Sequence, residues 1–116
     1  MYMPRVDDYG FGRIVIDGKM YSHDVILFWD GEIVKWWRKE GHSVCLEDVG
    51  RILEKKPEIV VFGTGKYGVM KVREEVREKL RSEGIEVVEL ISDEAVRKFN
   101  EVVKDRRAAL AIHLTC

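Results

Sequence analysis

The sequence predicts an α/β protein with a three-layer helix/parallel sheet/helix core and an N-terminal antiparallel β section packed on it. Two observations support this prediction. Apolar runs at residues 59–62, 85–90 and 108–114 alternate with two amphipathic patterns, and strands joined by helices pair in parallel. Residues 11–38 instead hold short extended runs around two Asp-Gly pairs, which indicate antiparallel hairpins. A chain of 116 residues is expected to form a single domain, residues 1–116.

The two Asp-Gly pairs define the predicted hairpins. Asp17-Gly18 joins residues 11–16 to 19–21, and Asp30-Gly31 joins residues 25–29 to 33–37, with positive φ expected at both positions of each turn. Neighbouring strand residues point to opposite faces, so only one of Trp36 and Trp37 enters the core easily. The other either packs under a helix or the N-terminal arm, or is exposed as a contact for a partner.

Three helices are predicted between and before the parallel strands. The first begins near residue 46 and ends at Pro57, because proline cannot continue a helix. The second covers about residues 69–83 and ends at Gly84. The third begins at Ser92, which is a plausible N-cap, and places residues 96, 99, 102 and 103 inward.

Composition excludes several classes of function. The chain has 20 Lys+Arg and 21 Asp+Glu, so its net charge of -1 provides no field for nucleic acid or an anionic membrane. It shows no signal peptide, transit peptide or membrane-spanning run, and its two cysteines cannot form a disulfide framework. We therefore expect a cytoplasmic protein. Abundant Glu, Lys and Arg with scarce Cys also fit a heat-adapted composition.

A glycine-rich corner between a predicted strand and a predicted helix is the main candidate site. Residues 63–68 read Gly-Thr-Gly-Lys-Tyr-Gly, and free amides there plus the helix dipole would favour a phosphate or carboxylate, with Lys66 and Arg73 adding charge. Alternatively, the glycines only permit a tight turn and close packing. A nicotinamide or flavin dinucleotide is not expected, because the chain holds about one half of a dinucleotide fold, and a P-loop is excluded because its Lys-Ser or Lys-Thr is missing.

Two His/Cys pairs raise the questions of metal and thiol chemistry. His42 with Cys45, and His113 with Cys116, have zinc-like spacing, but the second pair is poorly built for a ligand site, so no metal is expected. Cys45 near a helix start could have a lowered thiol pKa with His42 as its base. No orienting third group or oxyanion hole is recognisable, so an unreactive thiol and a non-enzymatic protein are favoured.

Four segments together resemble a known family. They are Trp29-Asp30-Gly31, the Gly63-Thr64-Gly65 corner, residues 95–100 and residues 106–114. They are similar to the small family that includes the adipogenesis-associated Mth-domain-containing protein and a mitochondrial complex I assembly factor. The resemblance covers residues 9–114 and implies a three-layer α/β domain with an added antiparallel sheet. It implies no established reaction; the mitochondrial relatives act in assembling a respiratory complex. It also points to Asn100, with the glycine corner, as a pocket lining.

These observations lead to three hypotheses. The first is a non-enzymatic binding or assembly module that presents the glycine corner and Trp36 or Trp37 to another protein. The second is a small-anion or nucleotide-binding protein whose pocket is lined by Gly63, Thr64, Gly65, Lys66, Arg73 and Asn100. The third is a thiol-dependent enzyme that uses Cys45. All three expect no cofactor, no metal, no nucleic acid and no membrane.

Overall fold

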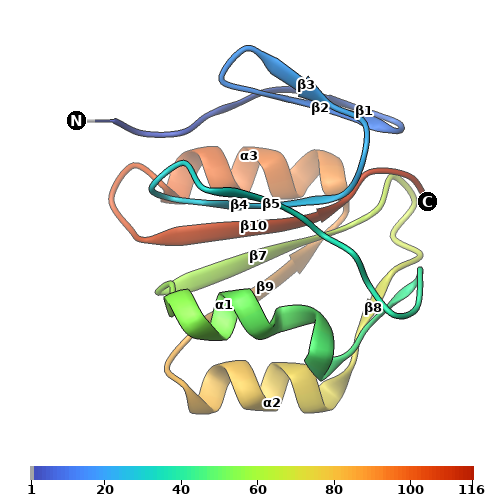
Figure 1. Cartoon of the computed structure of the whole chain (residues 1–116), viewed down its shortest axis with the longest axis vertical. Coiled ribbons are helices and arrows are strands. Elements are labelled where there is room, and N and C mark those ends of the chain that lie inside the picture. The colour runs from blue at the N-terminus through green and yellow to red at the C-terminus, as the bar shows by residue number, and fades with distance from the viewer. Residues whose placement is uncertain (1) are drawn as a thin grey trace.

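The main element of the fold is a mixed five-stranded sheet. The computed structural model describes residues 2–116 and orders this sheet β5-β4-β10-β7-β9 (Figure 1). Strands β7, β9 and β10 are parallel, whereas β4 is antiparallel to β10 and β5 is antiparallel to β4. The predicted parallel core is confirmed, and the second predicted hairpin extends the same sheet. The strands are β4 (Val25–Phe28), β5 (Ile33–Lys35), β7 (Ile59–Thr64), β9 (Glu86–Leu90) and β10 (Ala108–His113).

A separate antiparallel sheet forms the N-terminal section. It consists of β1 (Val6–Gly10), β2 (Arg13–Ile16) and β3 (Lys19–Tyr21) in sequence order. Asp17 and Gly18 both have positive φ, at 48° and 82°, which confirms the predicted two-residue turn. The prediction for the second hairpin is wrong in detail. Only Gly31 has positive φ there, and the Phe28 amide donates to the Glu32 carbonyl across a longer loop.

Helices cover both faces of the main sheet. Figure 1 shows α1 (Gly50–Lys55) and α2 (Glu74–Ser82) on one face, and α3 (Ser92–Val102) with the N-terminal sheet on the other. A 3₁₀ turn, η1 (Leu46–Val49), precedes α1. The short strands β6 (Ser43–Val44) and β8 (Lys71–Val72), which the sequence did not predict, pair in parallel.

Two predicted helix starts need correction. The helix expected from about residue 69 begins at Glu74, because Lys71 and Val72 are extended in the β6–β8 pair. Val72 is buried as a strand residue of this pair, so its apparently helical spacing was misleading. Ser92 is not the N-cap of α3: that position is Ile91, and the Ser92 hydroxyl is used elsewhere.

The core has two halves, one on each face of the sheet. Alternate residues of β7 serve the two halves: Ile59 and Val61 pack toward α3, while Val60 and Phe62 pack toward α1 and α2. All six residues of β7 are buried, as expected for a strand covered on both faces. In residues 2–116, no helix is long and apolar enough to cross a membrane.

Because both faces are covered, the two ends of the sheet remain as places for function. We call the end where β7, β9 and β10 finish the carboxyl edge, and the end where they begin the amino edge.

Candidate functional site

The glycine corner, residues 63–68, begins in the last two residues of β7 at the carboxyl edge, but its amides are already bonded within the chain. The Gly65 amide donates to the Ser92 hydroxyl at 2.9 Å. The Lys66 amide donates to the Thr115 carbonyl at 2.7 Å, and those of Tyr67 and Val69 donate to the Cys116 main-chain oxygen at 3.2 and 3.1 Å. The prediction that this corner offers free amides is therefore wrong.

The conformation of Gly65 explains why glycine stands there. Its φ is +105°, and a Cβ at this position would lie 2.2 Å from the carbonyl carbon of Cys116. The chain after β10 thus lies directly against the corner. The first residue of α2 is Glu74, so the positive end of that helix dipole does not begin at residues 63–68 as predicted. This geometry supports the alternative that the glycines permit close packing.

The other side chains predicted for the anion pocket have separate partners. Lys66 pairs with Asp93 at 3.0 Å, and Arg73 pairs with Glu40 at 2.9 Å. Asn100 holds the main chain of Val6 through two hydrogen bonds of 2.9 Å. Asn100 therefore fixes β1 to α3, and these three side chains are not gathered around one ligand position.

A buried polar cluster that the sequence did not predict lies at the same edge. Asp24 accepts hydrogen bonds at 2.8 Å from Arg38 Nη1 and His113 Nδ1. Its second oxygen accepts from the Leu114 amide, also at 2.8 Å. The Arg38 side chain is only 4% exposed. Burial opposes ionisation of Asp24, but these hydrogen bonds lower its pKa below the usual value. The only signal in the sequence was a histidine inside an otherwise apolar strand.

The cluster extends to Thr115, whose hydroxyl lies 3.3 Å from His113 Nε2. A hydroxyl, an imidazole and a carboxylate therefore stand in the order of a hydrolytic triad, as Thr115, His113 and Asp24. Two features argue against that role. Arg38 shares the same carboxylate oxygen, and the nearby amides that would form an oxyanion hole are bonded to residues 115 and 116. The arrangement instead ties β4, β10 and the chain end together.

Cys45 lies in a buried position at the start of η1, as the favoured prediction of an unreactive thiol expects, and not in the setting that the thiol-enzyme alternative needs. Burial raises the pKa of its thiol, whereas thiol catalysis needs the pKa lowered. Its Sγ lies 3.8 Å from Glu40 Oε2. His42, the expected base, packs its ring against His113 with centroids 5.6 Å apart. The described part of the chain also brings together no three His, Cys, Asp or Glu side chains as metal ligands.

The two neighbouring tryptophans separate as the alternation predicted. Trp36 is 5% exposed and donates its indole N–H to the Asp48 carbonyl at 2.9 Å. Its ring packs on Phe62, with centroids 6.2 Å apart. Trp37 is 74% exposed, which makes it the candidate for a contact with a partner. Both lie at the carboxyl edge, because the Trp36 amide donates to the Asp24 carbonyl just before β4.

Further exposed apolar side chains gather at the carboxyl edge. Phe11 and Tyr67 are 56% and 74% exposed, and their ring centroids are 6.5 Å apart. Phe11 reaches this edge because the Gly12 amide donates to the Leu114 carbonyl. Exposed Ile91 lies beside Gly68. We call Phe11, Trp37, Tyr67 and Ile91 the carboxyl-edge aromatic surface. Phe11 was missed because residues 11–16 were predicted as one strand, whereas β2 begins at Arg13 and Phe11 lies in the turn before it. Tyr67 was missed because the glycine corner was interpreted only as a ligand site.

Comparisons with known proteins identify relatives of the chain. The sequence profile of a family described as "Protein of unknown function (DUF498/DUF598)" matches residues 6–113. A conserved hypothetical protein from Pyrococcus horikoshii OT3 is 25% identical, with a TM-score of 0.89 over 97% of this chain and 99% of its own. The protein MT938 is 28% identical, with a TM-score of 0.79 over 97% and 99% of the two chains. A protein of Bartonella henselae described as an outer membrane protein is 26% identical, with a TM-score of 0.79 over 97% and 100%.

Proposed function

The chain belongs to the family of unknown function DUF498/DUF598, and we propose that it is a non-enzymatic, cytoplasmic binding or assembly module for another protein. This family includes the adipogenesis-associated Mth-domain-containing protein and the mitochondrial complex I assembly factor, so the resemblance predicted from the sequence is confirmed. The observation that most supports the proposal is the carboxyl-edge aromatic surface.

The side chains of this surface are of the kind that anchors protein interfaces. Large aromatic side chains are the residues that most often anchor protein interfaces, because each contributes a large rigid contact area. Here Trp37 and Tyr67 are each 74% exposed at one end of the sheet. Ion pairs lie close in the chain to three of the apolar side chains: Lys66 with Asp93 near Tyr67 and Ile91, and Arg13 with Asp8 near Phe11. An apolar centre with a charged rim is the usual anatomy of a protein-binding surface.

The two alternative functions have weaker support. A small anion at the glycine corner would have to displace residues 115 and 116, whose oxygens occupy the corner amides. Thiol chemistry at Cys45 would need an ionised sulfur, while burial raises the pKa of this thiol. Surface recognition requires neither change.

Site-specific photo-crosslinking tests the proposal in the cells that make the protein. A photoreactive phenylalanine analogue replaces Tyr67 in one version of the protein and Met20 in another. Met20 is the matched control, since it is also exposed (61%) and apolar but lies on β3 of the N-terminal sheet. We expect one defined protein adduct from position 67 and none of the same mass from position 20.

The same assay with substitutions identifies the surface that carries the contact. Trp37→Ala should reduce the adduct from position 67 at least about fivefold, as expected when an aromatic anchor worth more than 1 kcal/mol is lost. The control Met20→Ala should leave it unchanged, and circular dichroism should show both variants folded. Equal adducts from positions 67 and 20, or no adduct at either, would contradict the proposal.

A further inference from the structure

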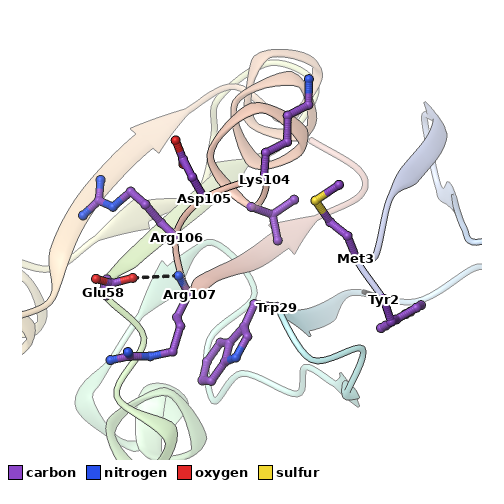
Figure 2. A pocket seen from close by; sticks show the side chains of 9 residues that line it. Tyr2, Met3, Trp29, Glu58, Lys104, Asp105, Arg106 and Arg107 are labelled. Atoms are coloured by element: carbon purple, nitrogen blue, oxygen red, sulfur yellow. Dashed lines mark hydrogen bonds between the residues drawn. The ribbon is translucent and has the colours of Figure 1, made fainter.

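The amino edge of the sheet, opposite the carboxyl-edge aromatic surface, holds a pocket of about 410 Å³ beside Trp29 (Figure 2). We call it the Trp29 pocket. Its residues come from the N-terminal arm, the end of β4, the start of β7 and the turn between α3 and β10. They are Tyr2, Met3, Trp29, Glu58, Val103, Lys104, Asp105, Arg106 and Arg107.

The indole of Trp29 is held in place from the α1 side. Lys55 lies 4.9 Å from the ring centroid and is itself fixed to Asp30 at 2.5 Å and Glu32 at 3.0 Å. The Trp29 ring also packs against both halves of the core, while part of it stays exposed. The pocket therefore has a preformed flat aromatic wall.

The N-terminal arm forms a second, fixed wall. The Tyr2 hydroxyl donates to Asp17 at 2.5 Å, and the Arg5 amide donates to the same carboxylate at 3.0 Å. The Tyr2 ring also lies over Gly31, where a Cβ would come within 2.7 Å of it. Figure 2 shows Tyr2 and Met3 on the side of the pocket away from Arg106 and Arg107.

The charged side chains of the pocket are unequally paired. Arg106 pairs with Glu86 at 3.1 Å, and Glu58 accepts the Arg107 amide at 2.8 Å, drawn as a dashed line in Figure 2. The side-chain nitrogens of Lys104 and Arg107 have no carboxylate within 4.0 Å anywhere in residues 2–116. The Arg107 guanidinium lies 5.9 Å from the Trp29 ring centroid.

We propose that the Trp29 pocket binds a small organic anion with a flat apolar ring, the ring against Trp29 and the anionic group at Arg107. The volume falls within the range of about 300 to 1,000 Å³ that is typical of small-molecule sites. The apolar walls of Trp29, Val103 and Met3 suit the ring, and a guanidinium without a carboxylate partner suits a carboxylate or phosphate. A cationic ligand would be repelled by Lys55 and Arg107, which already face the indole.

Titrations followed by two-dimensional ¹H–¹⁵N NMR test this site with three probes. They are 1-naphthoate, an aromatic carboxylate; 1-naphthyl phosphate, which carries a phosphate on the same ring; and 1-naphthalenemethanol, the uncharged match of the first. We expect 1-naphthoate, 1-naphthyl phosphate or both to shift the Trp29 indole N–H and the amides of residues 103–107, with weaker binding of the alcohol. Which anion binds more tightly distinguishes a carboxylate ligand from a phosphate ligand.

Matched charge variants make the result decisive. Arg107→Gln should weaken binding of the better anion at least about tenfold, the loss expected for a hydrogen bond to a charged group. Arg97→Gln is the control, because Arg97 is exposed on α3 and does not line the Trp29 pocket. Trp29→Leu should weaken all three probes. The proposal is overturned if no probe shifts these signals at 10 mM, if the alcohol binds as tightly as both anions, or if both arginine variants respond alike.

Discussion

The two ends of the main sheet differ in what the chain itself does there. At the carboxyl edge, residues 114–116 accept or donate hydrogen bonds with the glycine corner, with Asp24 and with the β1–β2 turn. At the amino edge, the Trp29 pocket stays open, and two of its cations have no carboxylate partner in residues 2–116. The glycine corner at the carboxyl edge is thus filled, and this edge presents aromatic rings outward, whereas the amino edge holds the Trp29 pocket.

Topology alone is therefore not enough to assign a function to a sheet edge. Ligands of parallel α/β sheets usually lie at the carboxyl edge, because loops and helix starts leave amides free there. Here β8 delays α2 until Glu74, and the chain after β10 takes up the amides. What remains at that edge suits a large partner, while the opposite edge suits a small ligand.

Substitution of the two neighbouring tryptophans should give the greatest contrast in stability, because one lies inside the carboxyl edge and the other on its surface. Trp36→Ala should destabilise the protein by about 4 kcal/mol, because it removes a buried ring that packs on Phe62. Trp37→Ala should change the free energy of unfolding by less than about 0.5 kcal/mol, since that side chain is exposed. Urea unfolding of both variants measures the contrast, and similar losses would contradict the division between an inner and an outer tryptophan.

The buried cluster should give the next largest effect. Asp24→Asn removes the carboxylate that balances nearly buried Arg38 and should cost about 3 kcal/mol in unfolding free energy. Asp8→Asn, which breaks the exposed pair with Arg13, is the control and should leave the free energy of unfolding nearly unchanged, because solvent screens that pair.

The pH dependence of the same cluster has a definite sign. The pKa of Asp24 is lowered in the folded protein, so its stabilisation is present above the usual carboxyl value of 3.8 and is lost as pH falls further. The difference between the wild-type protein and Asp24→Asn, measured by urea unfolding, should therefore shrink below that pH. A difference that grows with acid would contradict the ionised pairing.

The close packing at the glycine corner should appear as a larger loss of stability when its glycine is replaced than when a glycine with free space around it is replaced. Gly65 and Gly84 both have positive φ, but a Cβ would meet Cys116 at the first and nothing within 4 Å at the second. Gly84→Ala should cost about 1 kcal/mol from backbone strain alone. Gly65→Ala should cost about 2 kcal/mol more, because the chain end must move. Equal costs in urea unfolding would mean that residues 115 and 116 do not lie on the corner.

The smallest expected effect concerns the arm at the amino edge. Tyr2→Phe removes the hydrogen bond to Asp17 and should cost less than about 1 kcal/mol, since the pair is exposed. That hydrogen bond raises the pKa of Tyr2 to about 12. Its contribution should therefore be complete below pH 10 and be lost as pH rises toward 12. Urea unfolding at pH 8 and pH 11 should show the difference between wild type and variant shrinking.

Much of the fold was predictable because its signals are local. The apolar runs at 59–62, 85–90 and 108–114 and the Asp17-Gly18 turn follow from strand burial and turn chemistry. The start of α2 was not predictable, because Val69 and Val72 fit helical spacing while Val72 is fixed by pairing with Val44. That pairing joins residues 28 positions apart, and spacing within one segment does not reveal it.

The candidate site was predicted only in part for the same reason. The alternation of Trp36 and Trp37 is local, and it correctly placed them on opposite faces with only one in the core, while the exposure of the other was left open. The occupancy of the glycine corner depends on residues 115 and 116, about 50 positions away. The Trp29 pocket likewise combines the N-terminal arm with residues 103–107, and no motif in either segment indicates the other.

Hydrogen exchange at the glycine corner shows whether the chain itself fills this part of the carboxyl edge. The amides of Lys66, Tyr67 and Val69 donate to oxygens of residues 115 and 116. NMR-detected exchange should show these three amides protected at least about 100-fold relative to unstructured peptide, as expected for hydrogen-bonded groups that exchange only after local opening. Exchange at the rate of unstructured peptide would mean that the amides are free, and the glycine corner would again be the leading ligand site.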